Sequence, residues 1–258
     1  MFEDLKEEDI LLTLEHLSNT NDHGSSQYKV WYEGQEFSPA YVISKAFELK
    51  GKPVDRSSFT TDTAQGRLLE LGFPITDPSR DDGFFTPKDL LSLSKLVQRK
   101  YYNKHNTVDK SLGHYLRDIP WQKTKDWARK LGELGWRVEG GKQWQKRMGR
   151  KGSGFKDYTW FRIYPVNAVN DKICFTVGIH GEPDVSLVYK LHNQFTDEFF
   201  WSEGRQDIFD NYLRDHGIAW QHVWPHELIN MSWDDLVQRA HQFFTSNLDH
   251  FETISNQF

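Results

Sequence analysis

The sequence predicts an α+β protein made of two domains, at residues 1–82 and 83–258. Two observations predict this fold class: segments of helical and strand periodicity alternate along the chain, and polar turns separate them. A chain of 258 residues is long enough for two domains with cores of their own. Fifteen per cent of the residues are aromatic, and ten are Trp. These rings supply either large buried areas or flat stacking surfaces.

The first domain is expected to contain helices and one short hairpin. A helix is predicted over residues 7–18, where apolar residues from Ile10 to Leu17 recur at helical spacing. The segment "YKVWYEGQEF" then predicts two short strands joined by a tight turn at Glu33 and Gly34.

Two further helices of this domain have start and stop signals. Ser38 is a favoured N-cap, Pro39 fits the first helical position, and Gly51 ends the segment. A second helix is predicted from near Ala64 to Gly72. The domain therefore combines a small sheet with at least three helices.

Residues 28–75, "YKVWYEGQEFSPAYVISKAFELKGKPVDRSSFTTDTAQGRLLELGFPI", carry a resemblance. The pattern "Y.G..F.P..VI..A", followed by a helix ending in Gly-Phe, resembles the N-terminal head domain of ScoMcrA-like modification-dependent restriction enzymes. The resemblance implies a prokaryotic or phage defence setting, restriction, and recognition of modified DNA. Such enzymes cleave with a His-Asn-His nuclease braced by cysteine-bound zinc. This chain has no such motif and a single cysteine, Cys174, so a nuclease would be a separate subunit.

The second domain is predicted to place a short antiparallel sheet between helices. Thr86 and Asp89 form a capping box that opens a helix, and two more helices are predicted around residues 108–117 and 122–135. The segments "YTWFRIYPV", "KICFTVGIH" and "VSLVYKLH" predict three strands. A second capping box, Ser232 with Asp235, opens a C-terminal helical stripe.

Charge is unevenly distributed along the chain. Residues 88–163 contain 19 Lys and Arg against 7 Asp and Glu, whereas the rest of the chain contains 13 against 30. The net charge is therefore only -5, although one segment is strongly basic. Such asymmetry indicates a segment that faces a polyanion.

The basic segment predicts a DNA-binding surface, because Lys and Arg neutralise phosphates and release counterions. The predicted DNA-binding residues are Arg99, Lys100, Lys104, Lys123, Lys125, Arg129, Lys142, Lys146, Arg147, Arg150, Lys151 and Lys156. Reading a modified base often requires flipping it into a pocket with stacking aromatics and polar groups that read its edge. Trp144, Tyr158 and Trp160 flank a basic, glycine-rich loop and are the candidates for this base pocket. The alternative is that the rings belong to the core and the basic helix is a solvated face.

The sequence patterns for metal-dependent cleavage are weaker. Glu182, Asp184 and Lys190 lie around one strand, but Val188 stands where an Mg²⁺-dependent nuclease needs a metal-binding acid. We therefore expect no metal, no cofactor and no cleavage by this chain alone. A divergent nuclease remains the lesser alternative.

The histidines of "HGIAWQHVWPH" have a spacing that resembles a metal site. Pro225 breaks the helix that would bring His222 and His226 together, and no carboxylate or Cys completes a set with His216.

A different class of function also fits the charge pattern. The chain would then be a protein-interaction or regulatory subunit of a defence complex. Its affinity would depend less on salt than phosphate binding does. The kind of modification, the choice between DNA and RNA, and the oligomeric state stay open.

Compartment is suggested by cysteine content and by the chain start. The lone Cys174 excludes an internal disulfide framework and suits a reducing interior. The start is acidic, and no run of about eighteen apolar residues occurs. The sequence therefore predicts a cytoplasmic protein without membrane association.

Overall fold

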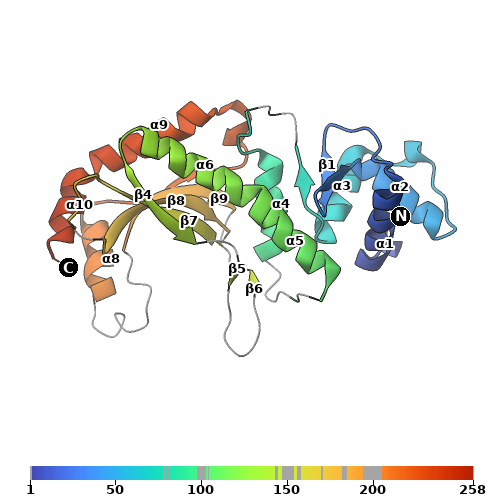
Figure 1. The fold of residues 1–258 in the computed structure, drawn as a ribbon, viewed down its shortest axis with the longest axis horizontal. Helices are drawn as coiled ribbons and strands as arrows, with labels where there is room; N and C mark the ends of the chain where they lie inside the picture. The colour runs from blue at the N-terminus through green and yellow to red at the C-terminus, as the bar shows by residue number, and fades with distance from the viewer. Residues whose placement is uncertain are drawn as a thin grey trace. The chain divides into compact units, whose positions relative to one another are not determined.

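The computed structural model has an α+β fold (Figure 1). It describes residues 2–77, 80, 82–97, 103, 105–142, 145–146, 154–155, 158–169, 171–181, 185–193 and 205–257. The chain divides into two compact units. The first comprises residues 1–121, 144–157 and 181–183, and the second comprises residues 122–143, 158–180 and 184–258.

The first unit contains five helices among its described residues and a three-stranded antiparallel sheet. The helices are α1 (Glu7–Thr20), α2 (Pro39–Leu49), α3 (Thr61–Glu70), α4 (Pro87–Val97) and α5 (Thr107–Asp118). The strands are β1 (Lys29–Tyr32), β2 (Gln35–Phe37) and β3 (Ile75–Thr76), in the order β2-β1-β3. Two short strands, β5 (Gln145–Lys146) and β6 (Gly154–Phe155), pair with each other.

The local signals of the sequence account for several of these boundaries. Glu33 and Gly34 both have positive φ, 47° and 86°, as a tight hairpin turn requires. Thr86 and Asp89 form the predicted capping box: the Thr86 N–H donates to Asp89 Oδ2 at 2.8 Å, and the Asp89 N–H donates to Thr86 Oγ1 at 3.3 Å. Ser38 occupies the N-cap of α2, but its hydroxyl makes no capping hydrogen bond.

The boundary between the units lies near residue 121 rather than after residue 82. Helices α4 and α5 pack with the first unit, because α4 contacts β3 and α5 contacts β1. The rings of Trp31 on β1 and Tyr115 on α5 lie 5.8 Å apart, and the Glu33 N–H donates to Ser111 Oγ at 3.4 Å. The small sheet therefore buries its apolar residues partly under helices that the sequence assigned to the next domain.

The second unit is built on a five-stranded antiparallel sheet with strand order β10-β9-β8-β7-β4. The strands are β4 (Arg137–Lys142), β7 (Tyr158–Tyr164), β8 (Ile173–His180), β9 (Ser186–Asn193) and β10 (Gln221–Val223). The helices are α6 (Pro120–Glu133), α8 (Arg205–Asp215), α9 (Trp233–Ser246) and α10 (Leu248–Ser255). The predicted strands are the three central ones, and β4 and β10 add an edge on each side. The predicted C-terminal stripe is broken at Asn247 into α9 and α10.

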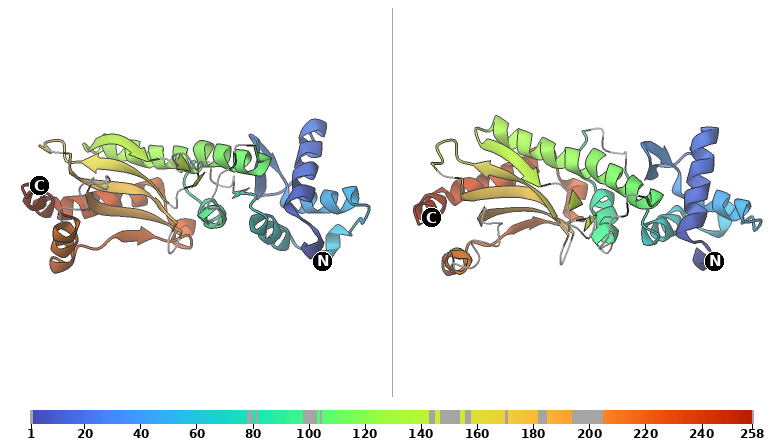
Figure 2. Two further views of the ribbon diagram at one scale, coloured as in Figure 1. Left: turned by 90° about the horizontal axis from the view of Figure 1, so that it is seen from below. Right: turned by 60° about the horizontal axis from the view of Figure 1, so that its bottom comes forward.

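Helices α6, α9 and α10 cover one face of this sheet, which we call the helix face. Phe175 of β8 stacks on Phe244 of α9 at 4.6 Å and on Phe251 of α10 at 5.4 Å. Tyr189 of β9 meets Trp127 of α6 at 6.5 Å. In Figure 2 the green α6 runs along the sheet on this side.

Trp136 completes the aromatic core of the second unit. Its ring meets Phe175 at 5.8 Å, and its Nε1–H donates to His241 Nδ1 at 2.9 Å. The core therefore holds both Trp127 and Trp136. None of the described helices combines the length and apolar character needed to cross a membrane.

Candidate functional site

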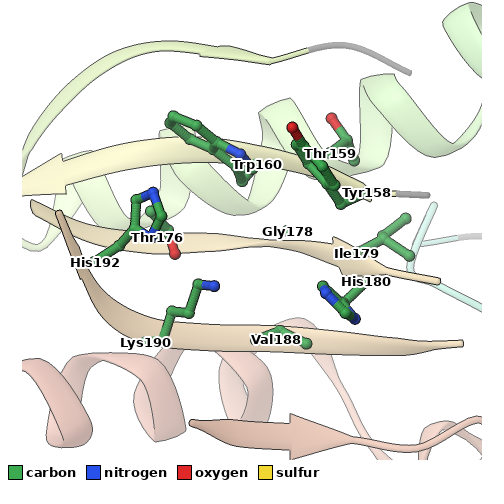
Figure 3. A pocket seen from close by; sticks show the side chains of 10 residues that line it. All are labelled: Tyr158, Thr159, Trp160, Thr176, Gly178, Ile179, His180, Val188, Lys190 and His192. Carbon is green, nitrogen blue, oxygen red and sulfur yellow. The ribbon is translucent and has the colours of Figure 1, made fainter. Parts of the chain in front are cut away.

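A cavity of about 240 Å³ lies on the other face of the five-stranded sheet, which we call the cavity face (Figure 3). It is lined by Tyr158, Thr159, Trp160, Thr176, Gly178, Ile179, His180, Val188, Lys190 and His192. All of these residues belong to β7, β8 and β9. The volume lies below the roughly 300–1,000 Å³ of pockets for drug-sized ligands. A single ring system is therefore the natural size of ligand.

The two faces follow from alternation along the strands, because successive side chains of a strand point to opposite sides of the sheet. On β8, Phe175 and Val177 belong to the helix face, while Thr176 lines the cavity. Across the sheet, Trp160 pairs with Gly178, and Gly178 pairs with Val188. The row that crosses the cavity thus has a large ring at one side and no side chain at its centre.

Two glycines allow the backbone of β7 to approach its neighbours closely at Trp160. A Cβ at Gly178 would lie 1.9 Å from the carbonyl oxygen of Thr159, and a Cβ at Gly141 would lie 2.1 Å from that of Trp160. The pairing of β4 with β7 also shifts register between Glu139 and Lys142. Such bulges re-aim side chains and are frequent beside functional sites.

Lys190 supplies the positive charge of the cavity. Figure 3 shows its side chain rising from β9 towards β8, into the space beside Gly178 and Thr176. Its Nζ lies 3.3 Å from the centroid of the Trp220 ring, a cation–π contact. Desolvation by burial lowers the pKa of Lys190 to about 8, although Cys174 and Asp210 act in the opposite direction.

Beside the cavity, β10 and its flanking residues form an aromatic row. Trp220 and His222 stack at 6.3 Å, and His222 and Trp224 stack at 5.1 Å with only 8° between their planes. Trp220 also contacts His180 of the cavity lining at 5.4 Å. His222 Nδ1 and Ser186 Oγ lie 2.9 Å apart in a hydrogen bond. Trp220 is 42% exposed, so this row continues the cavity into an accessible aromatic surface.

The structure brings together two of the three predicted base-pocket residues. Tyr158 and Trp160 both line the cavity, and Trp160 contacts His192 with ring centroids 5.5 Å apart. The third, Trp144, lies outside the described residues.

The predicted DNA-binding residues fall into three groups. Outside the described residues are Arg99, Lys100, Lys104, Arg147, Arg150, Lys151 and Lys156. For Lys142 on β4 and Lys146 on β5, the structure describes only the backbone. Lys123, Lys125 and Arg129 lie on α6.

The basic residues of α6 lie apart from the cavity. Because α6 covers the helix face through Trp127, it lies on the opposite side of the sheet from Tyr158 and Trp160. Arg129 also forms ion pairs within its own helix, with Glu133 and, at 3.7 Å, with Asp126. Helix α6 therefore does not share one surface with the predicted base pocket.

The glycine-rich stretch is more regular at its ends than the sequence suggested. Gly140 and Gly141 belong to β4, and residues 158–161 belong to β7. Residues 158–161 pair with β8, and the two glycines lie where the pairing of β4 with β7 shifts register, so the predicted glycine-rich loop is confined to the part between β4 and β7.

The histidines and acids that were considered as metal ligands do not form a metal site in the part of the chain that the structure describes. No group of three or more His, Cys, Asp or Glu there is arranged to hold a metal ion. His216 packs on Tyr212 at 4.1 Å, whereas His222 stacks on Trp224. Glu182 and Asp184 of the nuclease pattern lie outside the described residues.

A second cavity, of about 580 Å³, lies beside α9 and α10. Its polar lining includes His216, Arg239, Gln242 and His250. Arg239 donates to Glu227 Oε1 at 3.1 Å, so an acid of the protein already neutralises its charge. We therefore take the cavity on the sheet, whose lysine has no ion-pair partner among the described residues, as the candidate site.

Sequence reasoning missed that Lys190 lines the cavity and that Trp220 lies against its ammonium group. Lys190 interrupts the otherwise mostly apolar strand "SLVYKLHN", and Trp220, His222 and Trp224 alternate along "AWQHVW". A lone lysine in a central strand and alternating rings at an edge are the signals that were available.

The fold and the cavity together define an α+β protein with an aromatic, lysine-bearing pocket on a sheet face. Comparisons with protein-family models, curated proteins and solved structures find no match to this chain. Its function must therefore be argued from the site itself.

Proposed function

We propose that this chain binds nucleic acid, DNA foremost, and that the cavity face receives an unstacked base. The observation that carries the proposal is the cavity itself, which Trp160, Tyr158 and Lys190 all line. Aromatic rings stack on bases of any sequence, and a lysine donates hydrogen bonds to a base edge. The cavity volume suits one such ring system.

The charge pattern supports the same function. The excess of Lys and Arg in residues 88–163 suits a phosphate backbone, which supplies most of the sequence-independent affinity of such proteins. Base stacking and phosphate binding would then come from different parts of the chain, with the acidic remainder limiting non-specific association.

Recognition of a modified base is the more specific form of the proposal. It rests on the resemblance of residues 28–75 to the head domain of ScoMcrA-like enzymes, and it places the chain in a defence or restriction system. In this form the chain recognises DNA, and a separate subunit cleaves it. Base flipping would deliver the modified base to the cavity.

The test is a binding series measured by fluorescence anisotropy. The probes are plain, methylated, hydroxymethylated, glucosylated and phosphorothioated duplexes, with matched single-stranded DNA and RNA, across a range of salt concentrations. We expect the logarithm of the binding constant to fall linearly and steeply with the logarithm of salt. A weak salt dependence would favour the protein-interaction alternative instead.

Trp160→Ala tests the cavity, and Trp160→Phe is its matched control because it keeps a stacking ring. Loss of one stacked base costs about 1–3 kcal/mol, so we expect Trp160→Ala to bind roughly 5- to 150-fold more weakly. Trp160→Phe should retain most of the affinity. Equal binding by the parent and Trp160→Ala, with both proteins folded, would contradict the proposed role of the cavity.

The predicted loop is tested separately by reversing the charge of Lys146, Arg147, Arg150 and Lys151 together. Four lost phosphate contacts should flatten the salt dependence and abolish duplex binding at moderate salt. If the quadruple variant binds duplex as well as the parent does, the loop is excluded as a DNA-binding surface. The Trp160 variants then decide the role of the cavity.

A further inference from the structure

The polar groups of the cavity differ from those that typically bind the exocyclic amino groups of adenine and cytosine. Adenine is typically bound by Asn or Gln, and cytosine by Asp or Glu, whereas Lys or Arg bind the O6 and N7 acceptors of guanine. None of the described residues that line the cavity is Asp, Glu, Asn or Gln. The charged donor that lines it is Lys190.

The surroundings of Lys190 leave its ammonium group able to donate hydrogen bonds to an uncharged acceptor. Nζ lies over the Trp220 ring at 3.3 Å and has no ion-pair partner among the described residues. An ammonium group has three donors and no acceptor, so it binds carbonyl oxygens and ring nitrogens but not exocyclic amino groups. The aromatic walls favour a flat, apolar ring over a bare phosphate.

We infer that the cavity prefers guanine, through donation by Lys190 to adjacent O6 and N7 acceptors while the base stacks against Trp160. Guanine fits better than thymine or uracil, because its two acceptors are neighbours that one ammonium group can bind together. This inference rests on the proposed function, since it specifies which base the cavity takes.

The experiment uses the whole chain and single-stranded oligonucleotides with one variable base in a run of deoxyadenosines. The variable base is adenine, guanine, hypoxanthine, 2-aminopurine or 7-deazaguanine. Hypoxanthine keeps O6 and N7, whereas 2-aminopurine lacks O6 and 7-deazaguanine lacks N7. We expect guanine and hypoxanthine to bind roughly 5- to 150-fold more tightly than the other three bases, the range of one good two-acceptor contact.

Lys190→Met should abolish this preference, and Lys190→Arg should keep part of it, because a guanidinium group also binds O6 and N7. The matched control is Lys130→Met. Lys130 also lies over a tryptophan, with Nζ 5.5 Å from the Trp233 ring, but on α6 rather than in the cavity. This control should retain the preference.

The outcomes separate the two proposals. Oligonucleotide binding with equal affinity for guanine and 2-aminopurine, or a preference that survives in folded Lys190→Met, would overturn the guanine inference alone. Failure of the parent to bind any oligonucleotide or duplex would overturn the proposed function as well. Thermal unfolding of each variant identifies those that fail to fold, and Lys190→Arg then decides the inference by its retained preference.

Discussion

The two faces of the five-stranded sheet use similar residue types for opposite purposes. On the helix face, Phe175 is completely buried and lies among Trp136, Phe244 and Phe251. On the cavity face, Trp160 remains partly exposed beside Lys190. The same strands β7 and β8 supply both faces by alternation. The position of a ring within the strand pairing, and not the aromatic content, decides whether it packs in the core or lines the cavity.

Gly178 adds a second difference between the two faces. At Gly178 the cavity face lacks a side chain, whereas the preceding residue of the same strand, Val177, is buried on the helix face. The comparison predicts that mutations on the helix face change stability and that mutations on the cavity face change binding.

The largest expected effect is that of Phe175→Ala on the free energy of unfolding. Deleting a fully buried phenylalanine costs about 3–5 kcal/mol, because it removes apolar contacts and leaves a void. Urea unfolding followed by circular dichroism measures the loss. Trp160→Ala is the comparison on the other face and should cost less than half as much. A larger loss for Trp160 would show that the cavity face is part of the core.

Gly178→Ala should have the next largest effect. A Cβ at this position would lie 1.9 Å from the Thr159 carbonyl oxygen and 2.7 Å from the Trp160 Cα, so β7 must move. Overpacking of this kind costs about 1–3 kcal/mol, and the shift should also weaken nucleic-acid binding. The matched control is Gly140→Ala, since a Cβ at Gly140 meets no atom within 4 Å. Equal stability of the two variants would argue against a close approach of β7.

The sequence predicted the local structure of this molecule better than its site. Capping residues, turn glycines and apolar periodicity act over a few residues, so the sequence shows them directly. The predicted helices, the three central strands and the capping box at Ser232 are confirmed. Tyr158 and Trp160 were placed in one pocket because they are close in the sequence. That bases bind there stays a prediction.

What the sequence lacked was the pairing between distant segments. Lys190 meets Trp220 only because β9 pairs with β10, and the position of α6 opposite the cavity depends on which sheet face Trp127 covers. A run of basic residues does not specify the face of the sheet to which each belongs. For the same reason the sequence placed the domain boundary after residue 82, whereas α4 and α5 pack on strands far earlier in the chain and belong to the first compact unit.

The burial of Lys190 predicts a stability change with pH. Its pKa is lowered from 10.5 to about 8 in the folded protein, so between these values the unfolded chain binds more protons. The free energy of unfolding should therefore rise as pH increases from about 8 to 10.5, where the cost of burying the ammonium group is relieved. Below pH 8 this cost is fully present.

Lys190→Met removes that cost together with the cation–π contact to Trp220. At pH 7 the variant should therefore be more stable than the parent by about 1–2 kcal/mol, less than the full shift because Lys190 is partly exposed and the contact is lost. The advantage should shrink at pH 9.5. The titratable groups that face or flank Lys190 are Cys174 on β8, Asp210 on α8, and His180 and His192 in the cavity lining. These groups are present in both proteins, so their effects largely cancel in the difference. An advantage that stays constant with pH would contradict the assigned burial.

The smallest effect concerns the equivalent contact outside the cavity. Lys130 lies over Trp233 at 5.5 Å, and this cation–π contact is worth about 0.5–1 kcal/mol at most. Lys130→Met should therefore destabilise the protein slightly at pH 7. The two substitutions would then change the free energy of unfolding with opposite signs in the same urea measurement, because Lys190→Met relieves a cost of desolvation whereas Lys130→Met removes a stabilising contact. Equal signs would contradict the cost assigned to Lys190.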